Sequence, residues 1–128
     1  MSYYYNKTVE MTFDEAITKV TEELKKEGFG VLTEIDVTAA LKEKINVDFR
    51  KYRILGACNP VFAHKALLAE DKIGTMLPCN VIVQVREDGK IEVAAINPVA
   101  SMQAVENESL GEIASTIQSK LKQVIENV

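Results

Sequence analysis

Two segments with helical hydrophobic spacing, one near each end of the chain, limit the folds open to this sequence most strongly. Apolar residues recur every three to four positions over residues 13–27 and again from about residue 108 to residue 126. A helix with a single apolar stripe has to bury that stripe against another element. We therefore expect both helices to pack on one face of a layer built by the segments between and before them.

Residues at the ends of these helices support their boundaries. Thr12 and Glu15 have the spacing of a capping box, in which each side chain accepts a hydrogen bond from the backbone amide of the other residue. Gly28 suits the left-handed conformation that ends many helices. Asn107 is expected to cap the last helix. The apolar stripe of that helix comprises Leu110, Ile113, Ala114, Ile117, Leu121, Val124 and Ile125.

Five other segments have the composition and alternation of strands. They cover residues 3–11, 29–35, 52–58, 81–86 and 91–96. Between the last two, Asp88-Gly89 predicts a two-residue hairpin loop with positive φ at both positions, which sets Glu87 opposite Lys90. In that register, Ala94 and Ile96 lie opposite the face that carries Cys79, Val81, Val83 and Val85.

Two short helices are expected between the strands. One runs from about Val37 to Lys44 with Asp36 as its cap, and the other runs from Pro60 to about Glu70 with Asn59 at the N-cap. The second is apolar nearly all round, which is typical of a helix that is deeply buried or covered by a partner. Residues 71–78 are expected to form a loop, and residues 98–106 an irregular segment.

The resulting element order is β-α-β(4)-α with short inserted helices, which indicates a single α+β domain over residues 1–128 with a mostly antiparallel sheet. The net charge of -4 and the absence of a basic cluster argue against nucleic acid and anionic membrane surfaces as partners. No apolar run reaches the length of a membrane span, and no signal-peptide segment is apparent, so we expect a cytoplasmic protein with reduced thiols.

Two short stretches carry a family resemblance. The first is Arg53-Ile54-Leu55-Gly56-Ala57-Cys58-Asn59-Pro60, and the second is Met76-Leu77-Pro78-Cys79-Asn80-Val81. In this order and at this spacing, the chain resembles the bacterial and archaeal domain-of-unknown-function 302 family over essentially its whole length. The resemblance implies a fold of the TATA-binding-protein-like kind, in which a curved antiparallel sheet holds a long helix. It implies no activity, and fold kinship alone does not carry over DNA binding.

The two cysteines mark a candidate site. Cys58 closes one predicted strand and Cys79 opens the next, so antiparallel pairing would place these strand ends side by side. We expect any ligand to lie at this edge of the sheet. The candidate ligand-binding residues are Cys58, Asn59, Pro60, His64, Pro78, Cys79, Asn80 and Met102.

Three interpretations of this edge stay open. Cysteine often packs as a small hydrophobe, and Asn59 and Pro60 are explained by helix capping. Alternatively, Cys58, Cys79 and His64 form a soft-ligand or thiol site for zinc, copper or haem, although no motif makes a cofactor evident. In the third, the domain binds a small ligand in a pocket between sheet and helix, or a second copy of itself through the apolar helix. The suggested pocket residues are Tyr52, Ile54, Val83 and Ile117.

We favour a non-enzymatic binding or accessory domain that self-associates as a homodimer, with any ligand near Cys58 and Cys79. The alternative is a metal- or thiol-dependent activity of Cys58, Cys79 and His64. The sequence leaves open whether the protein is an enzyme.

Overall fold

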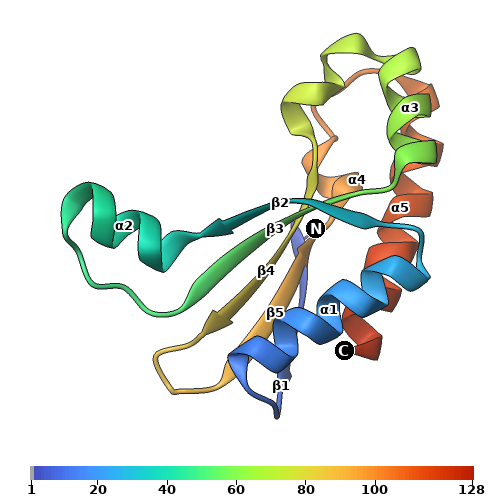
Figure 1. Ribbon diagram of the computed structural model, residues 1–128. Coiled ribbons are helices and arrows are strands. Elements are labelled where there is room, and N and C mark those ends of the chain that lie inside the picture. The colour runs from blue at the N-terminus through green and yellow to red at the C-terminus, as the bar shows by residue number, and fades with distance from the viewer. Residues whose placement is uncertain (1) are drawn as a thin grey trace.

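The alternating segments form a five-stranded antiparallel sheet in the order β1-β5-β4-β3-β2 (Figure 1). The computed structural model describes residues 2–128. The strands are β1 (Tyr4–Val9), β2 (Gly30–Asp36), β3 (Tyr52–Cys58), β4 (Cys79–Val85) and β5 (Ile91–Ile96). The sheet is curved and open, which confirms the expected α+β class with a mostly antiparallel sheet.

Helices α1 and α5 pack on one face of this sheet, while α2 stands apart at the far end of β2 and β3 (Figure 1). The helices are α1 (Phe13–Lys26), α2 (Val37–Ile45), α3 (Pro60–Ala69), α4 (Pro98–Ser101) and α5 (Glu108–Asn127). Both hydrogen bonds of the predicted capping box between Thr12 and Glu15 are present, and Gly28 has the expected positive φ of 85°. Asn107 caps α5 by accepting a hydrogen bond from the amide of Ser109.

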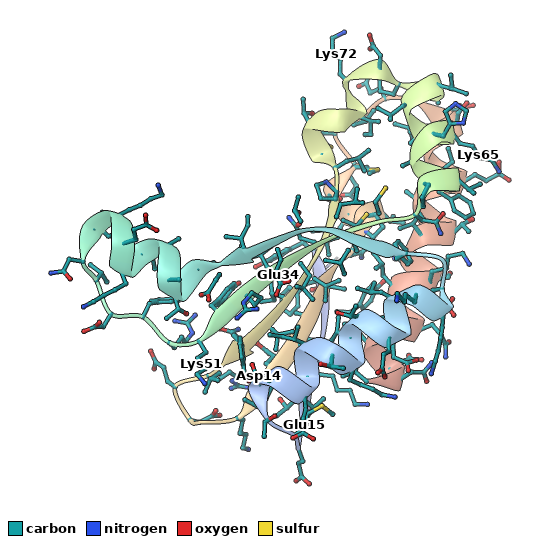
Figure 2. All side chains as sticks on the ribbon, viewed as in Figure 1. Asp14, Glu15, Glu34, Lys51, Lys65 and Lys72 are labelled. Carbon is teal, nitrogen blue, oxygen red and sulfur yellow. The ribbon has the colours of Figure 1, made fainter. Side chains whose placement is uncertain are left out.

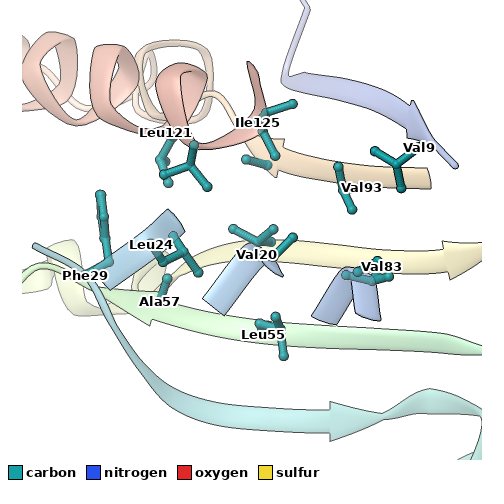
Figure 3. Close-up of a cluster of buried hydrophobic side chains, with 14 of the residues drawn as sticks. Val9, Val20, Leu24, Phe29, Leu55, Ala57, Val83, Val93, Leu121 and Ile125 are labelled. Atoms are coloured by element: carbon teal, nitrogen blue, oxygen red, sulfur yellow. The ribbon is translucent and has the colours of Figure 1, made fainter. Parts of the chain in front are cut away.

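The main core lies between the two long helices and the sheet (Figure 3). Val20 and Leu24 come from α1 and Leu121 from α5, and they meet Val83 and Val93 from the central strands. The predicted stripe of the last helix is buried, with Ile113 partly so. Burial of each such large aliphatic side chain contributes on the order of 1.5–3 kcal/mol. The alternation of side chains along the strands therefore gives the sheet one face that the helices cover and one face that they leave open.

The predicted hairpin register between β4 and β5 is wrong by one residue. Arg86 donates its amide to the carbonyl of Lys90, so the loop has three residues and Glu87 does not face Lys90. Gly89 has a φ of 83°, but Asp88 does not have positive φ. Ala95 and Val93, rather than Ala94 and Ile96, therefore lie opposite the core face of β4. A one-residue change in a hairpin reverses which side chains reach the core.

Two segments expected to lack regular structure contain short helical turns. Asp71–Met76 forms the 3₁₀-helix η1, and α4 begins at Pro98 within the segment expected to be irregular. The Asn97 side chain caps α4 by accepting hydrogen bonds from two of its amides. α4 depends on the Asn97 cap and on Pro98 at its start, whereas η1 has no side-chain cap. Both are too short to show hydrophobic periodicity, which is the signal that a sequence pattern detects best.

Helix α3 is less covered than its composition predicts. Val61 is 61% exposed and Leu68 is 76% exposed, while Ala66 is the buried residue of this helix. The helix packs on α5 and η1 with one side only. No helix in residues 2–128 combines the length and apolar character that crossing a membrane requires.

Candidate functional site

An apolar pocket of about 340 Å³ lies where β3 passes into α3 and where η1 passes into β4. Its walls come from the ends of these strands and from α3 and α5. Representative lining residues are Cys58, Phe62, Leu77, Cys79, Met102 and Ile117. Apart from the two thiols, Thr33 and Asn59 are the polar side chains in the described lining, so the pocket favours an apolar occupant.

Strand register brings the two cysteines to this pocket. Cys79 pairs with Ala57 across the β3–β4 ladder, and Cys58 is the next residue along β3. Both thiols are free and partly buried. The predicted neighbouring strand ends are therefore found, and both cysteines line one pocket.

Burial controls the state of the Cys79 thiol. It raises the pKa of Cys79 from 9.0 to about 11, and the neighbouring Cys58 adds to the shift. At neutral pH Cys79 is therefore a neutral thiol rather than a nucleophilic thiolate. Because the folded-state pKa is the higher one, this group contributes stability below pH 9.0, and that contribution is lost as the pH rises toward 11.

Asn59 has a different role from the one expected. It occupies the N-cap position of α3, but its side chain makes no capping hydrogen bond. Instead its Nδ2 donates to the carbonyl oxygen of Glu27 at 3.3 Å, and the side chain is buried. It also lies against Gly28, where a Cβ would come within 3.1 Å of that nitrogen. Asn59 therefore joins the end of α1 to the pocket wall.

The structure gathers five of the eight candidate residues. The residues that line the pocket are Cys58, Asn59, Pro78, Cys79 and Met102. Pro60 begins α3 as expected, but it is exposed and lies outside the lining.

The other two candidates point elsewhere. His64 is exposed on α3, next to Lys65, which projects outward in Figure 2. Asn80 follows Cys79 directly, so the pleat turns its side chain to the opposite face of the sheet, where it lines a second groove.

The proposed three-ligand metal set does not assemble. Within residues 2–128, no three His, Cys, Asp or Glu side chains lie close enough to hold one metal ion. His64 therefore does not complete a site with Cys58 and Cys79. A structural zinc site ordinarily has four protein ligands.

The suggested pocket between sheet and helix is also mostly wrong in its residues. Ile117 lines the pocket, whereas Val83 lies in the packed core and Tyr52 lies on the open sheet face. Sequence reasoning missed Phe62, which follows from the apolar character of α3 only once the packed side of that helix is known.

Comparisons with known proteins agree on one family. The family model described as "Domain of unknown function DUF302" matches residues 5–128. A crystal structure of an uncharacterized conserved DUF302 protein from Bacillus stearothermophilus is 32% identical and superposes with a TM-score of 0.92. The match covers 99% of this chain and 98% of that one. No curated protein matches significantly. This chain belongs to the DUF302 family.

Proposed function

We propose that this protein is a non-enzymatic binding domain that holds a small apolar molecule in the Cys58–Cys79 pocket. The observation that carries the proposal is a pocket of about 340 Å³ with an almost wholly apolar lining. Pockets that bind small molecules commonly have about 300–1,000 Å³ and mostly apolar walls. An apolar cavity of about 150 Å³ already takes up benzene in another protein.

The second candidate function, thiol or metal chemistry, has weaker support. A reactive thiol needs a lowered pKa, and the pKa of Cys79 is raised to about 11. Metal binding by Cys58 and Cys79 would need further ligands, and His64 lies outside the pocket lining. The two thiols therefore serve best as small, soft parts of an apolar wall.

Binding of a neutral apolar fluorophore, N-phenylnaphthylamine, tests the proposal. We expect its fluorescence to rise on addition of the protein and to saturate. Replacing Ala63 with phenylalanine puts a ring into the lining on α3, so the affinity should fall by about tenfold or more. Ala40 on α2 is also half-buried but lies outside the pocket, which makes Ala40→Phe the matched control with unchanged binding.

Thermal melts of both variants would establish that they remain folded. Equal binding by wild type and folded Ala63→Phe would contradict the proposal. Elemental analysis and thiol titration of the same samples address the second candidate. Bound zinc or copper, or a rapidly reacting Cys79, would favour metal or thiol chemistry instead.

We also propose self-association through the outward side of α3, with a second copy of the chain as the occupant. Val61 and Leu68 are largely exposed there, and Leu67 is 44% exposed. Homo-oligomers most often are two-fold dimers. Light scattering is expected to give the mass of two chains, and Leu68→Glu to reduce it to one. Ile45→Glu, at an exposed position on α2, should leave the dimer intact. A wild-type monomer at tens of micromolar would contradict this proposal.

A further inference from the structure

Helices α1 and α5 leave the opposite face of the sheet open, and a groove of about 380 Å³ crosses that face. Its floor includes Ile82 on β4 and Ala94 on β5, which pair directly across the ladder. Three aromatic side chains line the groove: Tyr3, Tyr4 and Tyr52. The small Ala94 side chain leaves room between them, so the groove is hollow rather than filled.

Glu92 is the one acidic residue among the described lining residues of this groove. Gln84 Nε2 donates to its Oε1 at 2.7 Å, and Asn6 Nδ2 donates to its Oε2 at 2.9 Å. Both donors are neutral amides. Glu92 forms no ion pair with any residue in the described part of the chain. The groove therefore holds a partly buried negative charge without a cationic partner.

Arg50 reaches this network through Gln84 and the neighbouring rings, and it forms no ion pair with Glu92. Its Nε donates to Gln84 Oε1 at 3.0 Å, and its guanidinium lies 4.3 Å from the centre of the Phe49 ring and 5.6 Å from the centre of the Tyr52 ring. Gln84 thus stands between Arg50 and Glu92. The positive charge is held at the rim, and the carboxylate stays available inside the groove.

Tyr52 interacts electrostatically with both Tyr3 and Glu92. Burial raises the pKa of Tyr52, the charge of Arg50 opposes that shift, and the charges of Tyr3 and Glu92 add to it. A neutral phenol ring presents a negative face that attracts cations, and the attraction strengthens where water is partly excluded. Aromatic rings beside a lone carboxylate are the combination that recognises organic ammonium ions.

The hydrogen bonds that Glu92 already accepts narrow the class of cation that the groove favours. Each oxygen of Glu92 already accepts one hydrogen bond, which reduces its capacity for further donors. A guanidinium or primary ammonium would have to share the carboxylate with these two amide donors, whereas a quaternary ammonium donates no hydrogen bond and needs none of its lone pairs. A metal ion would need several ligands, and Glu92 belongs to no group of three His, Cys, Asp or Glu side chains among residues 2–128 that could hold one.

We propose that this open-face groove binds a small quaternary ammonium ion, with its cationic head among the tyrosine rings and Glu92 and its apolar part on Ile82 and Ala94. The groove lies on the opposite face of the sheet from the core and is separate from the Cys58–Cys79 pocket. The proposal therefore does not depend on the apolar ligand proposed above.

Choline and its neutral isostere dimethylbutanol are the probes for this groove. Titration of the full chain, followed through the tyrosine ring resonances in NMR spectra, is expected to give saturable choline binding in the millimolar range. The isostere has the same shape without the charge, so its affinity should be lower by about tenfold or more. Equal affinity for both probes, or no choline binding at tens of millimolar, would overturn the proposal.

Matched variants separate the charge from the rings. Glu92→Gln should weaken choline binding by about tenfold while leaving the isostere unaffected. Glu106→Gln, at an exposed position outside the groove, should change neither. Tyr52→Phe should keep binding and Tyr52→Leu should lose it, because the ring face rather than the hydroxyl group contacts the cation.

If Glu92→Gln binds choline as tightly as the wild type, the proposal is contradicted, even if the tyrosine variants prove unstable. The competing occupant of the groove is a second copy of the chain. In that case the apparent choline affinity would fall as the protein concentration rises, and this result would also overturn the proposal. A choline affinity that is independent of protein concentration supports it.

Discussion

Replacing Leu121 with alanine is expected to lower the free energy of unfolding by about 2–5 kcal/mol. Leu121 on α5 is fully buried in the main core, which it shares with Val20 and Leu24 of α1 and with the central strands (Figure 3). Alanine at this position removes packed atoms and leaves a cavity that a five-stranded sheet and two helices cannot easily close. Urea denaturation, with the midpoint and slope fitted separately, measures the loss.

Ile45→Ala is the control for this prediction, since it truncates a similar aliphatic side chain that is 63% exposed on α2, outside the proposed self-association surface. Its effect on stability of the isolated chain should stay within about 0.5 kcal/mol. Similar losses in the two variants would mean that the core does not lie between α1, α5 and the sheet. An unchanged denaturant slope in Leu121→Ala would confirm that the native fold is retained.

Replacing Gly56 with alanine is expected to lower the free energy of unfolding by about 1–3 kcal/mol or more, because the added methyl group would overpack this position. A Cβ on Gly56 would collide with Thr33 Oγ1 and would come within 2.8 Å of Pro78 Cγ. Thr33 faces Gly56 because β2 has an irregularity between Val31 and Thr33. Pro78 is a rigid ring in the pocket lining, so N-phenylnaphthylamine binding should weaken as well.

Two further variants test the cause of this loss. Gly30→Ala adds the same methyl group to β2, where no atom lies within 4 Å of the new Cβ, and should be neutral or slightly stabilising. Thr33→Ala in the Gly56→Ala background removes the colliding hydroxyl and should recover part of the lost stability. Strict additivity of the two substitutions would show that they do not interact and would contradict this packing explanation.

Features determined by residues close together in the chain were predicted well. The capping box of Thr12 and Glu15 joins residues three positions apart, and Gly28 is required by the local backbone at the end of α1. The adjacency of Cys58 and Cys79 followed from chain order and antiparallel pairing. The predicted hairpin register was wrong because Asp88-Gly89 is compatible with loops of two or three residues. Packing of Val93 and Ala95 against the core determines which loop forms.

The open-face groove had no simple signal in the sequence. Tyr52, Gln84 and Glu92 come from three strands and meet only through long-range register. Sequence reasoning did not predict that these residues share a face. Tyr52 was expected in the pocket between sheet and helix, and the expected hairpin register turned the side of β5 that carries Glu92, Ala94 and Ile96 toward the core. It also did not predict a carboxylate without an ion-pair partner, because that depends on Arg50 reaching Gln84 instead.

The sequence by itself determined the order of strands and helices, the apolar stripes of the two long helices and the meeting of the two cysteine-bearing strand ends. Tertiary structure alone decided that His64 points away from the pocket, that Asn80 faces the other side of the sheet and that Asn59 binds the carbonyl of Glu27 rather than capping α3. The physical reason is the distance along the chain over which each interaction acts. Caps, turns and periodicity act between near neighbours, whereas the direction of a side chain at a strand end or on an evenly apolar helix depends on which distant surface it packs against.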